Sequence, residues 1–490
     1  MNNDYLKLTK AFDRYYILKK INSTLSWDTQ VKMPKDGFYI REKQLNLINQ
    51  EIDNSICNKE ISKLINNLDP SNLSKREQRN FFLMKRDFLH KNSLPQKLRE
   101  DFSKIALKTE FIWPEARKNN DYKLFDQYFS KLIKLLREIS QIKSEKLNLS
   151  KYETLLDLYC PSVKEEELDK VFTKLENKLP NLINKIIANQ TKPKLLHEQN
   201  IPKELQKKLF LAITEKFGIT NKWCLIDESE HPFCTGYNGD VRITTKYNEC
   251  DFTSAFMGII HESGHAIYDS NLPQNQCTKA IGQDAGMALH ESQSLFYEMQ
   301  IARSMEFCKF ALPHINKYLN LSISAADLYN NLNYVKKDYI RIDSDEVTYP
   351  LHIILRYNIE KDLINKKIET KDIPEIWAIQ TEKLFQLKAP KNQNGCLQDI
   401  HWSDGSLGYF PTYSLGAIYA SQIANKFRNI LSDFDNLIEA GNFAKINEVL
   451  KENIHKKAHS QNAEEIITEF CGSKLDADCY LRYLEKKFLP

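Results

Sequence analysis

The chain has 490 residues, of which 42% are apolar and 11% aromatic, a composition that can bury the core of a globular protein. Its net charge is only +4, from 69 Lys and Arg against 65 Asp and Glu, and both signs are spread along the sequence. This balance argues against binding to nucleic acid or to an anionic membrane surface. No stretch approaches the roughly 20 apolar residues that a membrane span needs.

The N-terminal residues and the cysteines indicate the compartment. Residues 1–20 contain no apolar segment of the kind found in secretory signals, so we expect a cytoplasmic protein. The ten cysteines lie far apart and include no C-x-x-C pair, which favours reduced, mostly buried thiols over a disulfide framework.

Helical periodicity dominates the chain. Glycine is scarce, and apolar residues recur every three or four positions, for example from Val171 to Ile186, so we predict a mainly α fold. The stretch Trp223–Tyr247 differs, because Pro, Gly and Asn interrupt it and it ends in an alternating run. We predict a small β-hairpin or short sheet there. Such a strand can pair with a substrate backbone, although a purely structural hairpin fits the pattern equally well.

The next segment, Ile259–Tyr268, reads IIHESGHAIY and contains an H-E-x-x-H motif. In a helix, His261 and His265 project from one face about one turn apart, so both side chains can reach one Zn²⁺ ion. Glu262 lies beside that face and suits the role of general base toward an attacking water. The alternative is a pair of histidines packed in a core helix, but the concentration of histidines in this part of the chain is more than packing requires.

A catalytic zinc usually has three protein ligands and one open position. Residues 284–305 show helical periodicity and offer two candidates for the third ligand, His290 and Glu291. The spacing favours Glu291, which begins a coherent helix face formed by Glu291, Leu295, Glu298 and Ala302, but it leaves His290 open. A His₂Glu site also admits Co²⁺ or Mn²⁺, because selectivity among these metals follows their availability.

Residues 340–360 are predicted to form a buried helix with a single polar stripe. The stripe consists of five residues three or four positions apart: Arg341, Asp345, Thr348, His352 and Arg356. It must face a polar network or a water-filled cleft, and Pro350 is expected to kink the helix. For Asp345 and Arg356 an internal ion-pair network is as good an interpretation as a substrate role. For Arg341 we favour a substrate role, because a guanidinium can bind a carboxylate through two hydrogen bonds.

The segment Gly395–Gly416 is rich in Gly, Pro and aromatic residues and is predicted to be irregular, as functional sites often are. Tyr409 and Tyr413 can each donate a phenolic hydrogen bond to an oxyanion or to a terminal carboxylate. We assign Trp402 and Phe410 to packing.

Together these motifs resemble those of the carboxypeptidase Taq family of zinc metallocarboxypeptidases, over the full length of the chain. The matching motifs are HPF at His231–Phe233, D-x-R-x-T at Asp240–Thr244, H-E-x-x-H at His261–His265, H-E-S-Q at His290–Gln293, I-R-x-x-A-D at Ile340–Asp345, G-x-x-Q-D-x-H-W at Gly395–Trp402 and G-Y-F-P-T-Y-x-L-G at Gly408–Gly416. The one departure is Ser344, where the family usually has Ala, and we expect it to leave activity intact.

The resemblance implies a mainly α, saddle-like fold of the zincin type, with a deep groove and a small β-sheet beside the active site. It implies one catalytic domain over residues 1–490, with a largely helical part at 1–220, the metal site and substrate groove at 221–420 and a helical part at 421–490. It also implies a homodimer that removes single residues from the C-termini of peptides with a free carboxylate.

For the site, the resemblance selects His261, His265 and Glu291 as zinc ligands and Glu262 as the base. It places six further residues along the substrate groove: Arg341, Arg242, His231, His401, Tyr409 and Tyr413. Arg341 is the first choice for reading the terminal carboxylate, and Arg242 is the second. Two alternatives stay open at this point, a zinc endopeptidase or oligopeptidase and a catalytically inactive helical scaffold.

Overall fold

The computed structural model describes residues 3–197 and 199–490. As predicted, the chain is mainly helical, and its described part includes a small three-stranded sheet. Two compact units divide the chain, and each is assembled from three separate stretches of sequence. Unit 1 comprises Met1–Phe88, Lys192–Asn333 and Tyr419–Leu475. Unit 2 comprises Leu89–Thr191, Tyr334–Ile418 and Asp476–Pro490.

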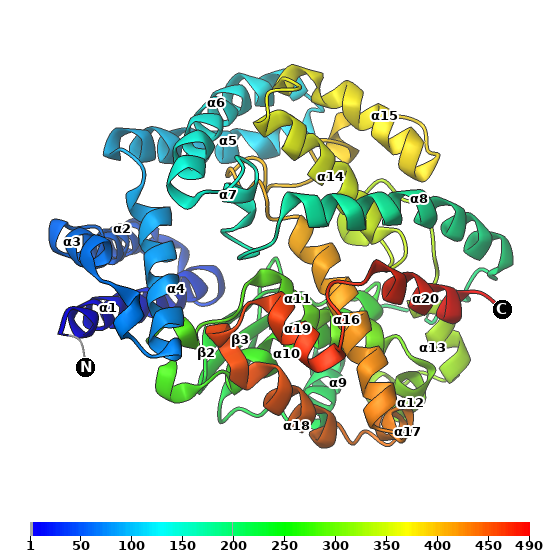
Figure 1. Cartoon of the computed structure of the whole chain (residues 1–490). Helices are drawn as coiled ribbons and strands as arrows, with labels where there is room; N and C mark the ends of the chain where they lie inside the picture. The colour runs from blue at the N-terminus through cyan, green and yellow to red at the C-terminus, as the bar shows by residue number, and fades with distance from the viewer. Residues whose placement is uncertain (1–2, 198) are drawn as a thin grey trace. The chain divides into compact units, whose positions relative to one another are not determined.

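Unit 1 contains the sheet and the helices around it (Figure 1). Its N-terminal stretch forms α1 (Asn3–Val31), α2 (Phe38–Ile56), α3 (Lys59–Asn67) and most of α4 (Lys75–Asn92). Its middle stretch forms α9 (Lys203–Lys216), β1 (Cys224–Glu228), β2 (Cys234–Tyr237), β3 (Asp240–Thr245), α10 (Phe252–Asn271), α11 (Met287–Leu295), a π-helix (Phe296–Ala302), α12 (Met305–Leu319) and α13 (Ala325–Leu332). Its last stretch forms much of α16 (Pro411–Ile430), then α17 (Phe434–Glu439), α18 (Ala444–Asn453) and α19 (Ala463–Cys471).

Unit 2 is built from helices. They are α5 (Gln96–Lys118), α6 (Tyr122–Leu147), α7 (Glu153–Leu156), α8 (Glu165–Asn189), α14 (Tyr349–Ile364), α15 (Ile373–Phe385) and α20 (Ala477–Phe488). Short 3-10 turns in the two units lie at Lys35–Gly37, Pro70–Asn72, Gln274–Gln276, Ala280–Gly282, Arg341–Asp343, Thr370–Asp372, Asn392–Asn394 and His455–Ser460.

The sheet confirms the prediction of strands between residues 223 and 247. Its order is β1-β3-β2, with β1 parallel and β2 antiparallel to the central strand β3. Val241 and Ile243 of β3 are fully buried and face the core. Because β3 has a neighbour on each side, only β1 and β2 present an edge of this sheet.

Helix α10 lies against the sheet and carries the H-E-x-x-H motif (Figure 1). The Asp251 side chain caps it by accepting a hydrogen bond from the backbone N–H of Thr253 at 3.0 Å. Its apolar side chains are buried almost all round the helix, and each contributes roughly 1.5–3 kcal/mol of transfer free energy. A helix so enclosed holds its polar side chains in fixed positions.

The prediction of one kinked helix over residues 340–360 was wrong. A 3-10 turn covers Arg341–Asp343, and α14 begins only at Tyr349, with Pro350 in its first turn. Proline costs nothing there, because the first N–H groups of a helix have no partner within the helix. The Asp345 carboxylate accepts hydrogen bonds from the backbone N–H groups of Val347 and Thr348 and holds the chain in a turn before the helix.

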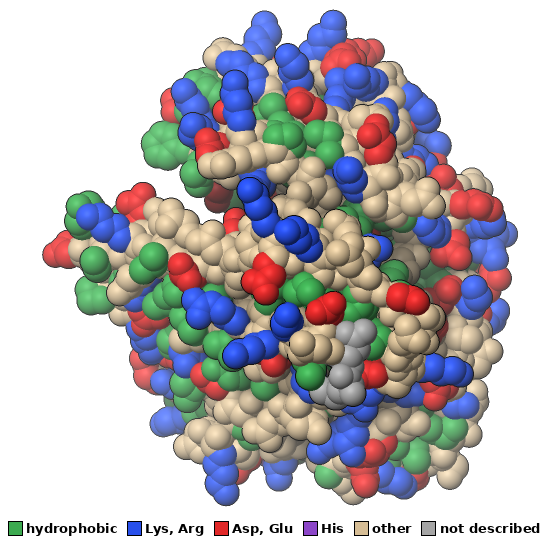
Figure 2. Space-filling view, turned by 60° about the vertical axis from the view of Figure 1, so that its left-hand side comes forward, with side chains coloured by type: hydrophobic (Ala, Val, Ile, Leu, Met, Phe, Trp, Pro, Cys, Tyr) green, Lys and Arg blue, Asp and Glu red, His purple; other side chains and the backbone are tan. Residues whose placement is uncertain are grey.

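The surface carries charges of both signs. On the face shown in Figure 2, Lys and Arg side chains are interspersed with Asp and Glu side chains, which agrees with the small net charge. Among residues 3–197 and 199–490, no helix combines the length and the apolar character needed to cross a membrane.

Candidate active site

Two helices of unit 1 bring together three side chains that could hold a metal ion. His261 and His265 lie one turn apart on α10, and Glu291 comes from α11. The Glu291 carboxylate is 3.8 Å from Nε2 of His261 and 3.4 Å from Nε2 of His265. One donor atom from each residue lies within 4.8 Å of the others, and the described part of the chain holds no other such group of three. His261, His265 and Glu291 therefore converge on one point.

The close approach of the two helices depends on Gly264, the residue before His265. A Cβ atom built on Gly264 would lie 2.5 Å from the backbone oxygen of Gln293 and 2.6 Å from Cα of Ser294. No real side chain tolerates such contacts, so only glycine lets α10 and α11 approach this closely.

The donor set fits a divalent metal ion. Nδ1 of His261 lies 2.9 Å from the Glu298 carboxylate, so in the neutral ring, which is the form that binds a metal, Nδ1 carries the proton and Nε2 has the lone pair. Two imidazole nitrogens and one carboxylate are the ligand set of a catalytic site that keeps an open position. One oxygen of Glu262 is buried beside them and has no hydrogen-bond partner among the described residues.

The electrostatics of the site follow from burial and from the crowding of carboxylates. Burial, reinforced by the charge of Glu291, raises the pKa of Glu262 to about 7, although His261 partly offsets the shift. Burial opposes a charge on His261, but Glu291 and Glu298 outweigh it and raise the pKa of His261 to about 10. A group of carboxylates that attracts protons this strongly also attracts a cation.

His290, the alternative third ligand in the sequence, makes other contacts. Its Nε2 lies 3.1 Å from the Asp269 carboxylate, and its ring stacks on His265 with centroids 4.2 Å apart and planes at 15°. The side chain thus packs behind His265 and does not join the group of three donors.

Four of the six predicted substrate residues gather in unit 2. The ring of His401 lies 5.3 Å from Tyr409, Tyr409 lies 5.5 Å from Tyr413, and the Arg341 guanidinium is 5.2 Å from the Tyr413 ring. Arg341 is only 5% exposed. Its Nε and Nη2 donate to one oxygen of Asp399 at 3.0 and 2.7 Å.

Asp399 joins Arg341 to a second arginine. Nε of Arg356, which is fully buried, donates to the other oxygen of Asp399 at 2.7 Å. Although burial opposes its charge, the two guanidinium groups hold the pKa of Asp399 well below its usual value. Two arginines share one carboxylate, so the cluster has an excess positive charge.

The other two predicted substrate residues, Arg242 and His231, belong to unit 1. Arg242 on β3 donates through Nε and Nη2 to Asp240 at 2.9 and 3.0 Å, and its guanidinium lies 4.5 Å from the Trp27 ring centroid. His231 is exposed, in the connection between β1 and β2.

Sequence reasoning missed two residues that organise these groups, Glu298 and Asp399. A signal existed for each, because Glu298 shares the predicted helix face of Glu291 and Asp399 lies within the motif G-x-x-Q-D-x-H-W. Neither pattern predicts which residue the carboxylate of Glu298 or Asp399 contacts.

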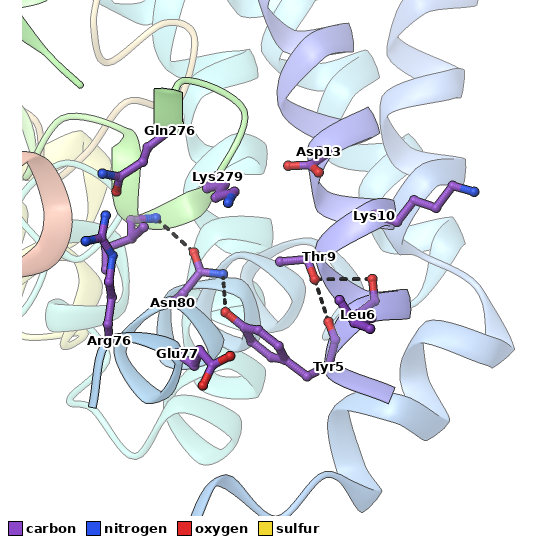
Figure 3. Close-up of a pocket in the computed structure, with 11 residues that line it drawn as sticks. Tyr5, Leu6, Thr9, Lys10, Asp13, Arg76, Glu77, Asn80, Gln276 and Lys279 are labelled. Atoms are coloured by element: carbon purple, nitrogen blue, oxygen red, sulfur yellow. Dashed lines mark hydrogen bonds between the residues drawn. The ribbon is translucent and has the colours of Figure 1, made fainter. Parts of the chain in front are cut away.

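A cavity elsewhere in unit 1 has a different character (Figure 3). It measures about 590 Å³ and lies among α1, α4 and residues 276–281. Polar groups at its wall bond to one another: Asn80 donates to the Tyr5 hydroxyl at 3.1 Å and accepts from the backbone N–H of Ile281 at 3.1 Å. None of the three candidate metal ligands lines this cavity, and its wall does not combine a base with metal donors.

The class of protein follows from the chemistry that the site of three donors can perform. A metallopeptidase needs a divalent cation held open on one side and a carboxylate that takes a proton from water. His261, His265 and Glu291 are the candidates for the first role, and Glu262 is the candidate for the second. The fold and the site are those of a metallopeptidase with the H-E-x-x-H motif.

Comparison with known proteins narrows this class. The family model described as carboxypeptidase Taq (M32) metallopeptidase matches residues 7–488. Carboxypeptidase 1 of Bacillus subtilis is 33% identical over 495 residues, which cover 99% of this chain and 97% of the relative. Among solved structures, metallocarboxypeptidase 1 of Trypanosoma cruzi has a TM-score of 0.96 at 31% identity, with 99% of each chain covered. The carboxypeptidase of Pyrococcus furiosus has a TM-score of 0.94 at 29% identity, with 100% of this chain and 99% of that chain covered.

The chain therefore belongs to the carboxypeptidase Taq (M32) family of metallopeptidases. It is a metallocarboxypeptidase, a hydrolase that acts on peptide bonds with the help of a divalent metal. The resemblance seen in the sequence is confirmed.

Proposed function

We propose that this enzyme uses zinc, held by His261, His265 and Glu291, to remove single residues from peptides with a free C-terminal carboxylate. The observation that carries the proposal is the convergence of these three donors within 4.8 Å of one another beside Glu262. Two imidazoles and one carboxylate suit Zn²⁺, and Co²⁺ or Mn²⁺ fit the same donors.

Glu262 is the general base in this proposal. When bound, the metal lowers the pKa of the attacking water and polarises the carbonyl of the last peptide bond. Glu262 takes a proton from that water as the oxygen attacks the carbonyl carbon, and it delivers the proton to the amine nitrogen as the C–N bond breaks. Burial raises the pKa of Glu262 to about 7, which suits a group that must both accept and return a proton near neutral pH.

Arg341 is our first choice for the residue that binds the terminal carboxylate. Its Nε, Nη1 and Nη2 each donate one hydrogen bond, so two of the five N–H groups of its guanidinium are left for a ligand. The excess positive charge that Arg341 and Arg356 have over Asp399 favours an anion. Arg242 is the second choice.

We also propose substrate-binding roles for His231, His401, Tyr409 and Tyr413. Tyrosine hydroxyls and a histidine ring can donate hydrogen bonds to the oxyanion or to the peptide backbone. Substitution of Arg341 by Ala, with Arg242→Ala as the matched comparison, separates the two carboxylate candidates. Hydrolysis of a free peptide at the parent rate by Arg341→Ala would remove Arg341 from the proposal.

The main experiment compares a short unmodified peptide with its C-terminal amide. The purified protein is incubated with each peptide in Zn²⁺ or Co²⁺, and separately with a chelator, and the products are identified by mass spectrometry. We expect stepwise loss of single C-terminal residues that requires metal and does not occur with the amide. Internal cleavage of both peptides would instead identify an endopeptidase, and no cleavage would identify an inactive scaffold.

We further propose that residues 1–490 act as one catalytic domain, and that the enzyme functions as a cytoplasmic homodimer. Light scattering coupled to size-exclusion chromatography tests the dimer, because the mass must be twice the 57.4 kDa of one chain. A mass of one chain at micromolar concentration would contradict it.

A further inference from the structure

The helix that supplies Glu291 changes its geometry just after that residue. The α-helical hydrogen bonding of α11 ends at Leu295, and a π-helix follows over Phe296–Ala302. Turns of π-helix are rare and are frequently found at functional sites. Glu298 lies in this turn with a side chain that is 15% exposed, so its carboxylate is held largely inside the protein.

Both oxygens of the Glu298 carboxylate are engaged. Oε2 lies 2.9 Å from Nδ1 of His261, and Oε1 accepts a hydrogen bond from Nη2 of Arg303 at 3.0 Å. Arg303 is fixed in turn, because its Nη1 donates to the backbone oxygen of Leu332 and its own backbone oxygen accepts from Asn333 at 3.1 Å. Arg303 therefore fixes the carboxylate through Oε1, and Oε2 is directed at His261.

This contact decides which nitrogen of His261 is available to a metal. A neutral imidazole has one N–H and one lone pair. The Glu298 carboxylate accepts the N–H of Nδ1, so the lone pair is on Nε2, the nitrogen that faces Glu291 at 3.8 Å. The negative charge of the carboxylate also makes the imidazole a stronger donor.

His265 has no comparable partner. Its Nδ1 is buried without a hydrogen bond to any described residue, and its ring is held by stacking on His290. Both histidines face Glu291 through Nε2, but only His261 has a charged group at its Nδ1. The Nδ1 sides of the two imidazoles thus differ: that of His261 contacts a carboxylate, whereas that of His265 makes no hydrogen bond with any described residue.

We propose that Glu298, held by Arg303, is the positioning residue that orients His261 for metal binding and raises the affinity of the site. This inference rests on the proposed metal site at His261, His265 and Glu291. Partners of this kind are worth about 10–100-fold in metal affinity, so the same loss is expected when the Glu298 charge is removed.

The test is the metal dissociation constant of Glu298→Gln, measured at neutral pH by competition of Zn²⁺ with a chromophoric chelator. The glutamine can accept from His261 or from Arg303, but not from both, because its NH₂ group must face one of these donors. We expect binding about 10–100-fold weaker than in the parent protein. Glu439→Gln is the matched control, since it removes one negative charge from an exposed ion pair with Lys309 and should leave the constant unchanged.

Two further measurements separate positioning from simple structural support. Unfolding temperatures are recorded with and without Zn²⁺. A purely structural role for Glu298 would lower both temperatures equally and keep the dissociation constant, whereas a positioning role reduces the stabilisation that zinc provides. Glu298→Asp, which retains the charge on a shorter side chain, should give an intermediate affinity, and it takes the place of Glu298→Gln if that variant does not fold.

The outcomes distinguish this inference from the proposed function. If the parent protein binds no equivalent of metal, or if His261→Ala binds as tightly as the parent, the metal site itself is wrong. If the parent binds one equivalent, and Glu298→Gln and Glu298→Asp bind within about twofold of it, the site stands and the role of Glu298 is refuted.

Discussion

Replacing Gly264 with Ala tests the approach of α10 to α11. By helix propensity alone the change should stabilise α10, because Ala is favoured over Gly by about 0.5–1 kcal/mol in a helix interior. The packing predicts the opposite. The new methyl group would lie 2.5 Å from the backbone oxygen of Gln293 and 2.6 Å from Cα of Ser294.

The size of the disturbance follows from these distances. Ordinary contacts begin at 3.4 Å, so the two helices must separate by about 0.9 Å (3.4 − 2.5 Å), because a backbone atom cannot rotate away as a side chain can. Overpacking of this kind costs about 1–3 kcal/mol. Glu291 lies two residues before Gln293 on α11 and moves with it, while metal–ligand distances tolerate only about 0.2 Å.

The assay combines metal binding with stability. Gly264→Ala is expected to bind Zn²⁺ at least about tenfold more weakly than the parent and to unfold at a lower urea concentration. Gly258→Ala is the matched control, because Gly258 lies on the same helix and a Cβ there meets nothing within 4 Å. That control should bind metal normally and gain about 0.5–1 kcal/mol in the free energy of unfolding.

Equal metal affinities in the two alanine variants would refute the reasoning. Such a result would mean that α11 reaches its place without the close contact at Gly264. A loss of stability in both variants would show that glycine is needed in α10 for some reason other than packing.

Three further predictions concern other parts of the molecule. Glu262→Gln should bind one equivalent of metal but hydrolyse peptides about 10²–10⁴-fold more slowly, and a kcat within tenfold of the parent would exclude Glu262 as the base. Asp399→Asn leaves the buried guanidinium groups of Arg341 and Arg356 without their counter-charge, so urea unfolding should show a loss of about 3–5 kcal/mol, and a loss below about 1 kcal/mol would contradict the ion-pair cluster. Burial lowers the pKa of His455 to about 3, so the unfolded chain binds the additional proton between that pH and 6.5. The free energy of unfolding should therefore rise with pH through this window, by at most about 1.4 kcal/mol per pH unit, and His455→Asn should remove that part of the slope.

The metal helix shows what local sequence can predict. The spacing of His261 and His265 fixes their relative direction once the segment is helical, and the apolar flanks predict that it is helical and buried. The approach of Glu291 was harder to predict. It depends on the close contact between Gly264 and the backbone of Gln293 and Ser294. The motif includes this glycine, but it does not predict which segment packs against it.

The segment 340–360 shows where periodicity misleads. Its apolar residues have helical spacing, but the Asp345 side chain bonds to nearby backbone N–H groups and favours a turn over a helix. Periodicity alone predicts a kink at Pro350, although proline is favoured in the first turn of a helix. In this chain the turn at Asp345 precedes the helix, and Pro350 lies in the first helical turn.

Glu298 and Asp399 show what a single sequence cannot give. Glu298 contacts a histidine 37 positions away, and Asp399 contacts an arginine 58 positions away. Each lies in a segment that sequence analysis singled out, yet its role is defined by the residue across from it. Contacts between residues so far apart in the sequence are determined by tertiary packing, and local sequence patterns carry no information about them.

The division into three stretches per unit has a consequence for biosynthesis. A ribosome releases residues 261–291, and with them every candidate metal ligand, well before it makes Tyr419–Leu475, which completes the same unit. His455, which is in hydrogen-bond contact with Asn271 of α10 and Gln293 of α11, comes in that late stretch. The packing around α10 and α11 is therefore completed only after this later stretch has been synthesised. A chain truncated after residue 291 would contain all the candidate metal ligands but would lack the later residues that pack against α10 and α11.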